Sequence, residues 1–489
     1  MLFNSHIFML LFLPLLLAGW YFLNWKKKFQ LAQGYLIGMS LWFYAYANLQ
    51  YLWLLLFSCL IGWLLSCLPE KIFSEKGKKV LTGVGCVFHL GLLGYFKYSN
   101  FFLENLNTVF HTDFPMLQIL LPVGISFYTF QQLAYLIDRC RGDAPRDSFF
   151  DYLTFMVYFP QLLQGPILLR SEFMGQLKEP ERRRFHAGQF SEGIQFFVFG
   201  LAKKVLLADT LAKAVNYGYS NVSMLDSISA LLLAAGYLTE LYFDFSGYCD
   251  MAVGLGKMIG LEVAENFDAP FHSASVKEFW RRWHMTLGRF FTRYVYIPLG
   301  GNRKGKMRTL CNVMIVMLLS GLWHGAAWTF VLWGFLHGVG MIWDNLEHPH
   351  LPKKWMRQAA TFAYVCMTFV FFRAESIAQG VDVLKSIVSL KWNGFVFQMA
   401  SALDLTEFYM ITKALSMKLP GLLSWFWLGI FVVLIAICFR VLSGEKVSGV
   451  VALQRQKGYG RLYPVLLAVL FTWSMISMTG VSEYLYFSF

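Results

Sequence analysis

Long apolar segments recur along this chain, and they restrict its fold more than any other feature. A helix needs about 20 apolar residues to cross the hydrocarbon core of a bilayer. We expect one all-α polytopic membrane domain over residues 1–489. About eleven segments qualify as spans, near residues 6–24, 31–47, 49–68, 80–97, 116–137, 189–208, 225–248, 309–343, 355–373, 423–440 and 462–480.

The composition fits this class and argues against a nucleic-acid-binding protein. Charged residues make up 15% of the chain, below the roughly 25% typical of soluble domains. The net charge of +13 comes from short Lys and Arg clusters between apolar segments, and not from one basic face. The 8 cysteines are scattered without metal-ligand spacing. We therefore expect a bilayer protein with no nucleic-acid partner and no metal.

The charges of the loops predict how the segments are oriented. Three lysines follow the first apolar run and no Lys or Arg precedes it, so the positive-inside rule places the N-terminus outside the cytoplasm. Alternating crossings then put the basic loops 70–79 and 138–146 inside and the weakly basic loop 98–115 outside. The tail 481–489 is expected outside as well.

Two segments break this regular pattern. Residues 152–169 contain two prolines and a glycine between basic stretches that belong on the same side, so we expect a re-entrant or interfacial segment. Residues 309–343 are too long for one untilted crossing and contain Gly321 and Gly325 near their middle. We expect two helices there that meet inside the membrane, as a re-entrant or hairpin segment.

Residues 249–308 form a basic region without a spanning segment, which the alternation places on the cytoplasmic side. Between Trp280 and Tyr294, apolar residues recur at three- and four-residue spacing, which predicts an amphipathic helix at the inner interface. It is either a membrane-surface helix with snorkelling arginines or a functional element. His284 lies on its apolar side, and the turn-rich segment 296–303 allows a ligand to approach the backbone.

His324 is the side chain best placed for chemistry. It follows Arg308 by 16 residues, which is about 24 Å along a straight helix, deep in the membrane. An ionisable residue at that depth either is functional or is paired inside the bundle. A buried imidazole stays neutral and can take the proton of a hydroxyl that attacks an acyl group. A thioester donor for this reaction requires no bound cofactor.

The remaining ionisable residues have simpler interpretations. We expect His337 to pack inside the bundle, and His348 and His350 to lie in a solvated loop. Asp244 and Asp250 come at the end of a predicted span, where they either cap or pair with arginines or orient the histidine.

Several motifs together resemble the membrane-bound O-acyltransferase family, most closely its alginate O-acetyltransferase branch. Trp280-Arg-Arg-Trp-His284 with Tyr294-Val-Tyr-Ile-Pro-Leu-Gly-Gly-Asn-Arg303 is similar to the family's cytoplasmic signature. Ser320-Gly-Leu-Trp-His324-Gly is similar to the segment around its invariant histidine. The opening residues 1–5 and the segments 159–166 and 242–250 resemble the same branch.

The resemblance implies a helical bundle around a central tunnel in a bacterial inner membrane. The donor, acetyl-CoA or an acyl carrier protein, is presented from the cytoplasm, and the acceptor is handled outside. His324 is the implied catalytic residue and His284 its supporting one. The residues expected to bind substrate are Trp283, Tyr296, Asn302, Arg303, Trp323, Asp244 and Asp250.

The expected function is O-acetylation of an extracytoplasmic polysaccharide such as alginate, with an extracytoplasmic acetyltransferase partner that completes transfer. Alternatives within the family are D-alanyl transfer to teichoic acid and acylation of a lipid or a secreted protein. A transporter without chemistry would show paired internal repeats, and none is seen in the sequence. The aromatic tail either anchors the last helix in the headgroups, or docks a partner or relays the acyl group through Tyr484 or Tyr486.

Overall fold

The computed structural model describes the chain except for residues 47–48, 68–74, 347–352, 404, 406–407, 441–446, 458–459, 461, 479–483 and 486–489. Every regular element in the described part is a helix. The first half of the chain contains η1 (Phe8–Phe12), α1 (Leu13–Trp25), α2 (Phe29–Ala45), α3 (Leu49–Cys67), α5 (Glu75–Leu93), η2 (Gly94–Tyr98), α6 (Ser99–Phe110), α7 (Ile125–Arg141), α8 (Phe149–Val157), α9 (Phe159–Leu162), α10 (Arg170–Leu177), η3 (Glu181–Arg183), α11 (Ala187–Ala202), η4 (Lys203–Ala208), α12 (Asp209–Ser220) and η5 (Val222–Met224).

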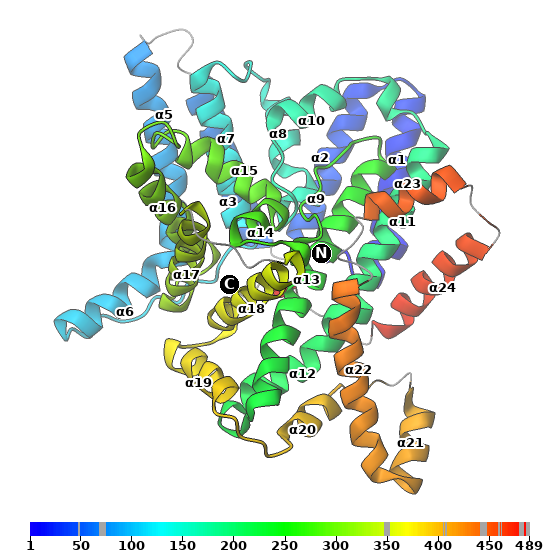
Figure 1. Cartoon of the computed structure of the whole chain (residues 1–489). Coiled ribbons are helices and arrows are strands. Elements are labelled where there is room, and N and C mark those ends of the chain that lie inside the picture. Colours follow the sequence, from blue (N-terminus) through cyan, green and yellow to red (C-terminus); the bar gives the residue numbers. More distant parts are fainter. Residues whose placement is uncertain are drawn as a thin grey trace.

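The second half begins with the longest helix and continues with shorter ones (Figure 1). These elements are α13 (Ser227–Met258), η6 (Pro270–His272), α14 (Val276–Arg282), α15 (Met285–Phe291), η7 (Thr292–Tyr296), α16 (Lys306–His324), α17 (Trp328–Asn345), α18 (Lys354–Arg373), α19 (Ile377–Val388), α20 (Phe395–Ser401), α21 (Tyr409–Lys418), α22 (Pro420–Arg440), α23 (Val447–Lys457) and α24 (Leu462–Ser477).

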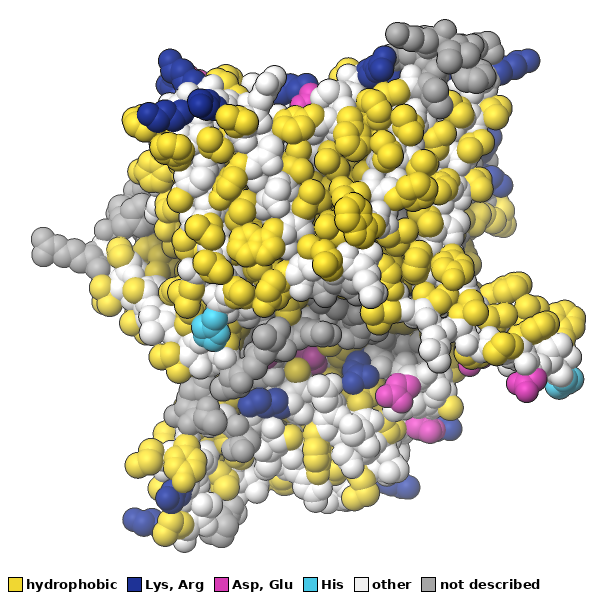
Figure 2. Space-filling model, turned by 180° about the vertical axis from the view of Figure 1, so that it is seen from behind, with side chains coloured by type: hydrophobic (Ala, Val, Ile, Leu, Met, Phe, Trp, Pro, Cys, Tyr) yellow, Lys and Arg dark blue, Asp and Glu magenta, His cyan; other side chains and the backbone are white. Residues whose placement is uncertain are grey.

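The described helices confirm the all-helical membrane class. Five are long and apolar enough to cross a bilayer: Phe8–Trp25, Leu49–Cys67, Lys76–Phe110, Ser227–Met258 and Lys306–His324. The helices Gly421–Ile437 and Leu462–Ser477 are apolar but shorter. Figure 2 shows hydrophobic side chains over a broad band of one face, with Lys and Arg gathered along its upper edge. Such a band is what a surface that faces lipid requires.

Helix α13 is the centre of the core (Figure 1), and 78% of its most apolar stretch is buried. It packs closely on α11 where glycines face each other. A Cβ on Gly200 would lie 2.5 Å from the Gly247 carbonyl oxygen, and one on Gly254 would lie 2.6 Å from the Gly193 oxygen. Small residues let two helix backbones approach in this way.

The predicted end of this span at residue 248 is wrong. Helix α13 continues to Met258, so Asp244 and Asp250 lie inside a helix and not at its end. Both carboxylates are tolerated there because they accept hydrogen bonds from lysines of the π-helix η4: Lys204 pairs with Asp244, and Lys203 pairs with Asp250, each at 2.6 Å.

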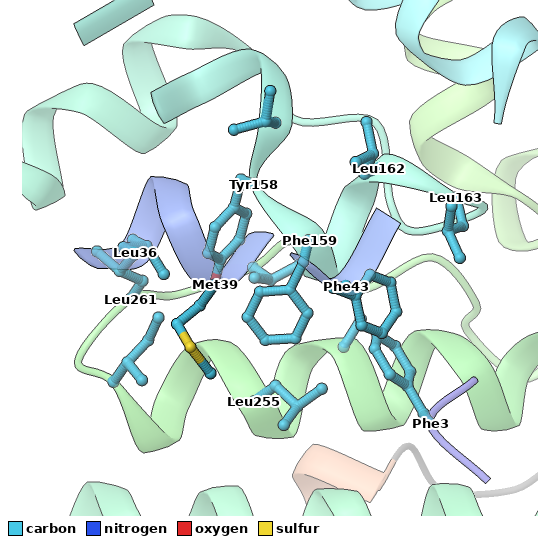
Figure 3. Close-up of a cluster of buried hydrophobic side chains, with 14 of the residues drawn as sticks. Phe3, Leu36, Met39, Phe43, Tyr158, Phe159, Leu162, Leu163, Leu255 and Leu261 are labelled. Atoms are coloured by element: carbon cyan, nitrogen blue, oxygen red, sulfur yellow. The ribbon is translucent and has the colours of Figure 1, made fainter. Parts of the chain in front are cut away.

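The broken segment 152–169 is covered by protein. Helices α8 and α9 are short, and the buried hydrophobic side chains around them belong to the cluster drawn in Figure 3. The Phe159 ring packs against those of Phe3 and Phe43, with centroid distances of 6.2 and 5.3 Å. Irregular backbone at membrane depth requires such cover.

Candidate active site

His324 is the last residue of α16, where the chain turns back into α17. The two helices pack closely because glycines lie at their contact. A Cβ on Gly321 would lie 2.3 Å from the Phe330 carbonyl oxygen, and one on Gly334 would lie 2.4 Å from the Met317 oxygen. Gly321 therefore serves helix packing, and it brings the end of α16 against the start of α17.

The imidazole of His324 lies among aromatic rings and is only 4% exposed. Its ring centroid is 4.9 Å from that of Trp323, 5.2 Å from that of Trp333 and 5.1 Å from that of Phe372. These rings come from α16, α17 and α18, so three helices shield the imidazole from water.

One side of this residue faces a small cavity of about 60 Å³. The segment that joins α6 to α7 forms much of its wall, and Gly124 in that segment has a φ of 77°. The lining residues are Lys97, Leu121, Pro122, Val123, Gly124, Ile125, Ser126, Phe127, Leu163, Trp323 and His324. A water molecule needs roughly 10–15 Å³ of such space, so the cavity is large enough for a small group beside the histidine.

His284 lies at a break between two short helices, and the prediction of one continuous amphipathic helix from Trp280 to Tyr294 is wrong. Helix α14 ends at Arg282, and α15 begins at Met285. His284 between them has a left-handed backbone with φ 46°, a conformation that a residue other than glycine rarely adopts inside a helix.

Asn266 holds this break in place. Its side-chain oxygen accepts from the Thr286 backbone N–H at 3.1 Å and from the Thr286 hydroxyl at 2.9 Å, and it lies 3.2 Å from His284 Nδ1. The Met285 N–H donates to the Asn266 carbonyl at 2.9 Å. One asparagine thus replaces the hydrogen bonds that a continuous helix would have made.

The apolar face of this region packs on protein, and so the prediction of a membrane-surface helix is also wrong. The Phe290 ring stacks on that of Phe130, with centroids 4.1 Å apart. Two of the arginines opposite are paired: Arg289 with Glu172, and Arg293 with Asp138 at 3.0 Å. Carboxylates of the protein hold these guanidinium groups.

His284 and His324 meet the same indole ring. The centroid of Trp323 is 6.0 Å from that of His284 and 4.9 Å from that of His324. Burial lowers the pKa of His284 to about 3, since its 1% exposed ring cannot be hydrated as a cation. His284 is therefore neutral at physiological pH.

The other residues expected at the site divide into two groups. Trp283 is buried beside His284, and Trp323 contacts both histidine rings. Tyr296, Asn302 and Arg303 lie just before α16 begins, and the last two are exposed. The length of α16 separates that turn from His324 by roughly 27 Å. The structure therefore does not bring these three residues to the histidine.

A second polar cluster surrounds the described part of the tail. Lys204 lies 2.6 Å from Asp244 and 2.8 Å from Asp209, and its ammonium group is 4.6 Å above the Tyr484 ring. The Leu485 N–H donates to Asp244 at 3.0 Å. Tyr484 is 0% exposed, so the headgroup anchor expected of the tail is wrong for this residue. Tyr486 lies outside the described residues, as do His348 and His350.

His337 is a packing residue, as expected. It is fully buried, accepts a hydrogen bond from the Trp280 indole at 3.2 Å, and lies 2.9 Å from the Thr368 hydroxyl. Within the described residues, no group of three or more His, Cys, Asp or Glu side chains is arranged to hold a metal ion.

Sequence reasoning missed two residues at this site, Lys97 and Asn266. Lys97 ends the apolar run 80–97 on the side predicted to be extracytoplasmic, where lysines are scarce. That position was the available signal. Asn266 had none, because asparagines in a long polar loop are common.

Comparisons with known proteins agree with the motifs. The membrane-bound O-acyltransferase family profile matches residues 143–378. A peptidoglycan O-acetyltransferase from Helicobacter pylori is 35% identical over 80% of this chain and 80% of its own length. A probable alginate O-acetylase from Pseudomonas aeruginosa is 38% identical over 77% of this chain and 73% of its own.

A teichoic acid D-alanyltransferase from Bacillus subtilis is more distant, at 28% identity over 52% of this chain and 69% of its own length. The three relatives all move acyl groups, by their names, and the matched region contains both His284 and His324. The chain therefore belongs to the membrane-bound O-acyltransferase family and is a multi-pass O-acyltransferase.

Proposed function

We propose that this enzyme transfers an acetyl group from a cytoplasmic thioester, acetyl-CoA or an acyl carrier protein, for O-acetylation of an extracytoplasmic polysaccharide. The observation that carries the proposal is His324, a shielded histidine at a helix end beside a cavity of about 60 Å³. Two relatives are named for acetyl transfer to polysaccharides, one to peptidoglycan and one to alginate.

In the proposed reaction, His324 acts as general base. It takes the proton of the acceptor hydroxyl while the hydroxyl oxygen attacks the thioester carbonyl carbon. The new C–O bond forms and the carbonyl oxygen becomes an oxyanion. When this intermediate collapses, the C–S bond breaks, and the leaving thiolate takes the proton from the imidazolium. The products are an O-acetyl ester and a free thiol, and no cofactor or metal is needed.

The size and charge of the cavity favour acetyl over the alternatives. Its volume corresponds to about four water molecules, which suits two carbons and one oxygen and excludes a long fatty acyl chain. The ammonium group of Lys97 lines the same space. A D-alanyl group carries its own ammonium, so two like charges would be brought together in surroundings of low polarity. Acetyl has no such charge.

The membrane arrangement that we propose is the one expected from the loops. About eleven segments cross the bilayer around a tunnel, with both termini extracytoplasmic and the acceptor meeting the acyl group from outside. A partner acetyltransferase on that side completes transfer to the polymer. Tyr484 and Tyr486 are proposed as a docking or relay element, and for Tyr484 this requires that the tail leave its buried position.

The test is turnover of labelled acetyl-CoA by the purified full-length protein in detergent. We expect His324→Ala to lower turnover by about 10²–10⁴-fold, the usual contribution of a general base. His111→Ala is the matched control, because His111 is exposed after α6, and it should leave turnover unchanged. Equal turnover by wild type and His324→Ala would refute the assignment. A D-alanyl thioester offered in parallel should not be consumed.

A further inference from the structure

Lys97 is a lysine at membrane depth that faces the catalytic histidine. It lies in η2, a π-helical turn at the end of α5, within the candidate span Lys76–Phe110. Single π-helical turns inside longer helices are frequent at functional sites. An ionisable side chain at this depth is costly and needs a reason.

The ammonium group of Lys97 caps the end of α16. It donates to the carbonyl oxygens of Trp323 at 2.7 Å and His324 at 2.9 Å, and it lies 3.4 Å from the Ser126 hydroxyl. The neighbouring Tyr98 hydroxyl donates to the Leu322 carbonyl at 2.5 Å. The last carbonyls of α16 have no partners within their own helix, so η2 holds the turn that carries His324.

The charge of Lys97 is not neutralised as the charges of other interior lysines are. Lys203 and Lys204 are each paired with aspartates at 2.6–2.8 Å. In the described part of the chain, the partners of Lys97 are two carbonyl oxygens and one hydroxyl, with no carboxylate among them. Its side-chain nitrogen is thus held by neutral oxygens alone, beside the cavity that it shares with His324.

We propose that Lys97 is a second functional residue of the acyl-transfer site. Its ammonium group fixes the position of His324, and its charge stabilises the oxyanion formed when a hydroxyl attacks the acyl carbonyl in the cavity. A positive group already held where negative charge develops lowers the barrier without reorganisation. This inference rests on the proposed function, because it assumes acyl chemistry at His324.

A purely structural cap is the alternative, since cationic side chains favour helix C-termini. The two roles differ in what they require of residue 97. A cap needs hydrogen-bond donors, whereas oxyanion stabilisation needs positive charge. Lys97→Gln keeps donors and removes the charge. Lys97→Arg keeps the charge. Tyr98→Phe removes only the neutral hydroxyl that donates to the Leu322 carbonyl, and it leaves Lys97 in place.

The experiment measures kcat and KM for acetyl-CoA turnover by the full-length protein and these three variants. Lys97→Gln is expected to lower kcat by about 10²–10³-fold, as loss of one oxyanion donor does, with KM little changed. The kcat of Lys97→Arg should be at least tenfold higher than that of Lys97→Gln. Tyr98→Phe should keep kcat within about threefold, because it leaves the charge in place.

The inference fails if Lys97→Gln keeps kcat within threefold of wild type, or if it and Tyr98→Phe lose activity equally. Should Lys97→Gln not be recovered as monodisperse protein, Lys97→Asn replaces it under the same criteria, because it also keeps amide donors and removes the charge, and kcat of Lys97→Arg must exceed that of Lys97→Asn at least tenfold. His324→Ala separates the two proposals. If that variant is inactive while Lys97→Gln is fully active, this inference falls and the proposed function stands. Full activity of His324→Ala, or an inactive wild type, would overturn both.

Discussion

The buried cluster around Lys204 makes a quantitative prediction about folding. Lys204 and Asp244 are both almost fully buried and lie 2.6 Å apart, with Asp209 at 2.8 Å from the same ammonium group. Removing one member of a buried pair usually costs about 3–5 kcal/mol, because the other charge loses its partner away from water. We expect Asp244→Ala to cost about 3 kcal/mol, since Asp209 still neutralises Lys204.

Lys204→Met should cost more, about 5 kcal/mol. It leaves the buried Asp244 and the half-buried Asp209 near each other without this cation, and Glu240 is buried close by. The double variant Lys204→Met with Asp244→Leu removes both charges and replaces them with apolar groups. We expect the double variant to lose less stability than the two single variants lose together, by about 2–3 kcal/mol.

The assay is unfolding of the detergent-solubilised protein at increasing mole fraction of SDS, followed by tryptophan fluorescence. The four proteins form a double-mutant cycle. The cluster also accepts the Leu485 N–H and holds the Tyr484 ring, so the single variants should release the tail to added protease. Single losses that add within about 0.5 kcal/mol would show that the two charges do not interact, and would refute the reasoning.

Three further predictions concern packing, pH and the site. Gly200→Ala should destabilise the protein by about 1–3 kcal/mol in SDS unfolding, because its Cβ would lie 2.5 Å from the Gly247 carbonyl oxygen. Gly188→Ala on the same helix is the control: its Cβ would meet nothing within 4 Å, so this variant should be as stable as wild type or more stable. Burial lowers the pKa of His284 to about 3 from 6.5, so between these values the unfolded chain binds more protons and stability rises with pH. His284 should account for about 2 kcal/mol of the stability that wild type loses between pH 7.5 and pH 5, so His284→Gln should lose about 2 kcal/mol less than wild type; an equal loss would contradict this. Asn266→Ala should lower kcat by about tenfold while the protein stays folded, because the His284 break loses its acceptor; unchanged kcat would contradict that role.

Several parts of the fold were predictable from local sequence. The segments 49–68 and 355–373 match α3 and α18 within a residue or two, and the break in 309–343 falls at the turn between α16 and α17. The physical reason is that a bilayer offers no hydrogen bonds to the backbone, so an apolar segment must form a helix whatever its neighbours are. His324 was also identifiable, because an ionisable residue deep in such a segment stands out.

The boundaries of α13 and the break at His284 were not predictable in this way. The helical periodicity of residues 280–294 is real, but hydrogen bonds from Asn266 end the helix at a position that periodicity cannot reveal. Helix α13 continues through two aspartates because lysines on another element neutralise them. In both cases the deciding partner is distant in sequence.

The sequence by itself determined the membrane class, most of the apolar helices and His324 as the candidate for catalysis, since each depends on hydrophobicity and on a single residue's surroundings. Only the tertiary structure decided which groups meet. Lys97 and His324 are 227 positions apart, yet the ammonium group of one caps the helix that ends in the other. Contacts of this kind follow from how helices pack, and packing is set by shape and charge between segments that no local pattern connects.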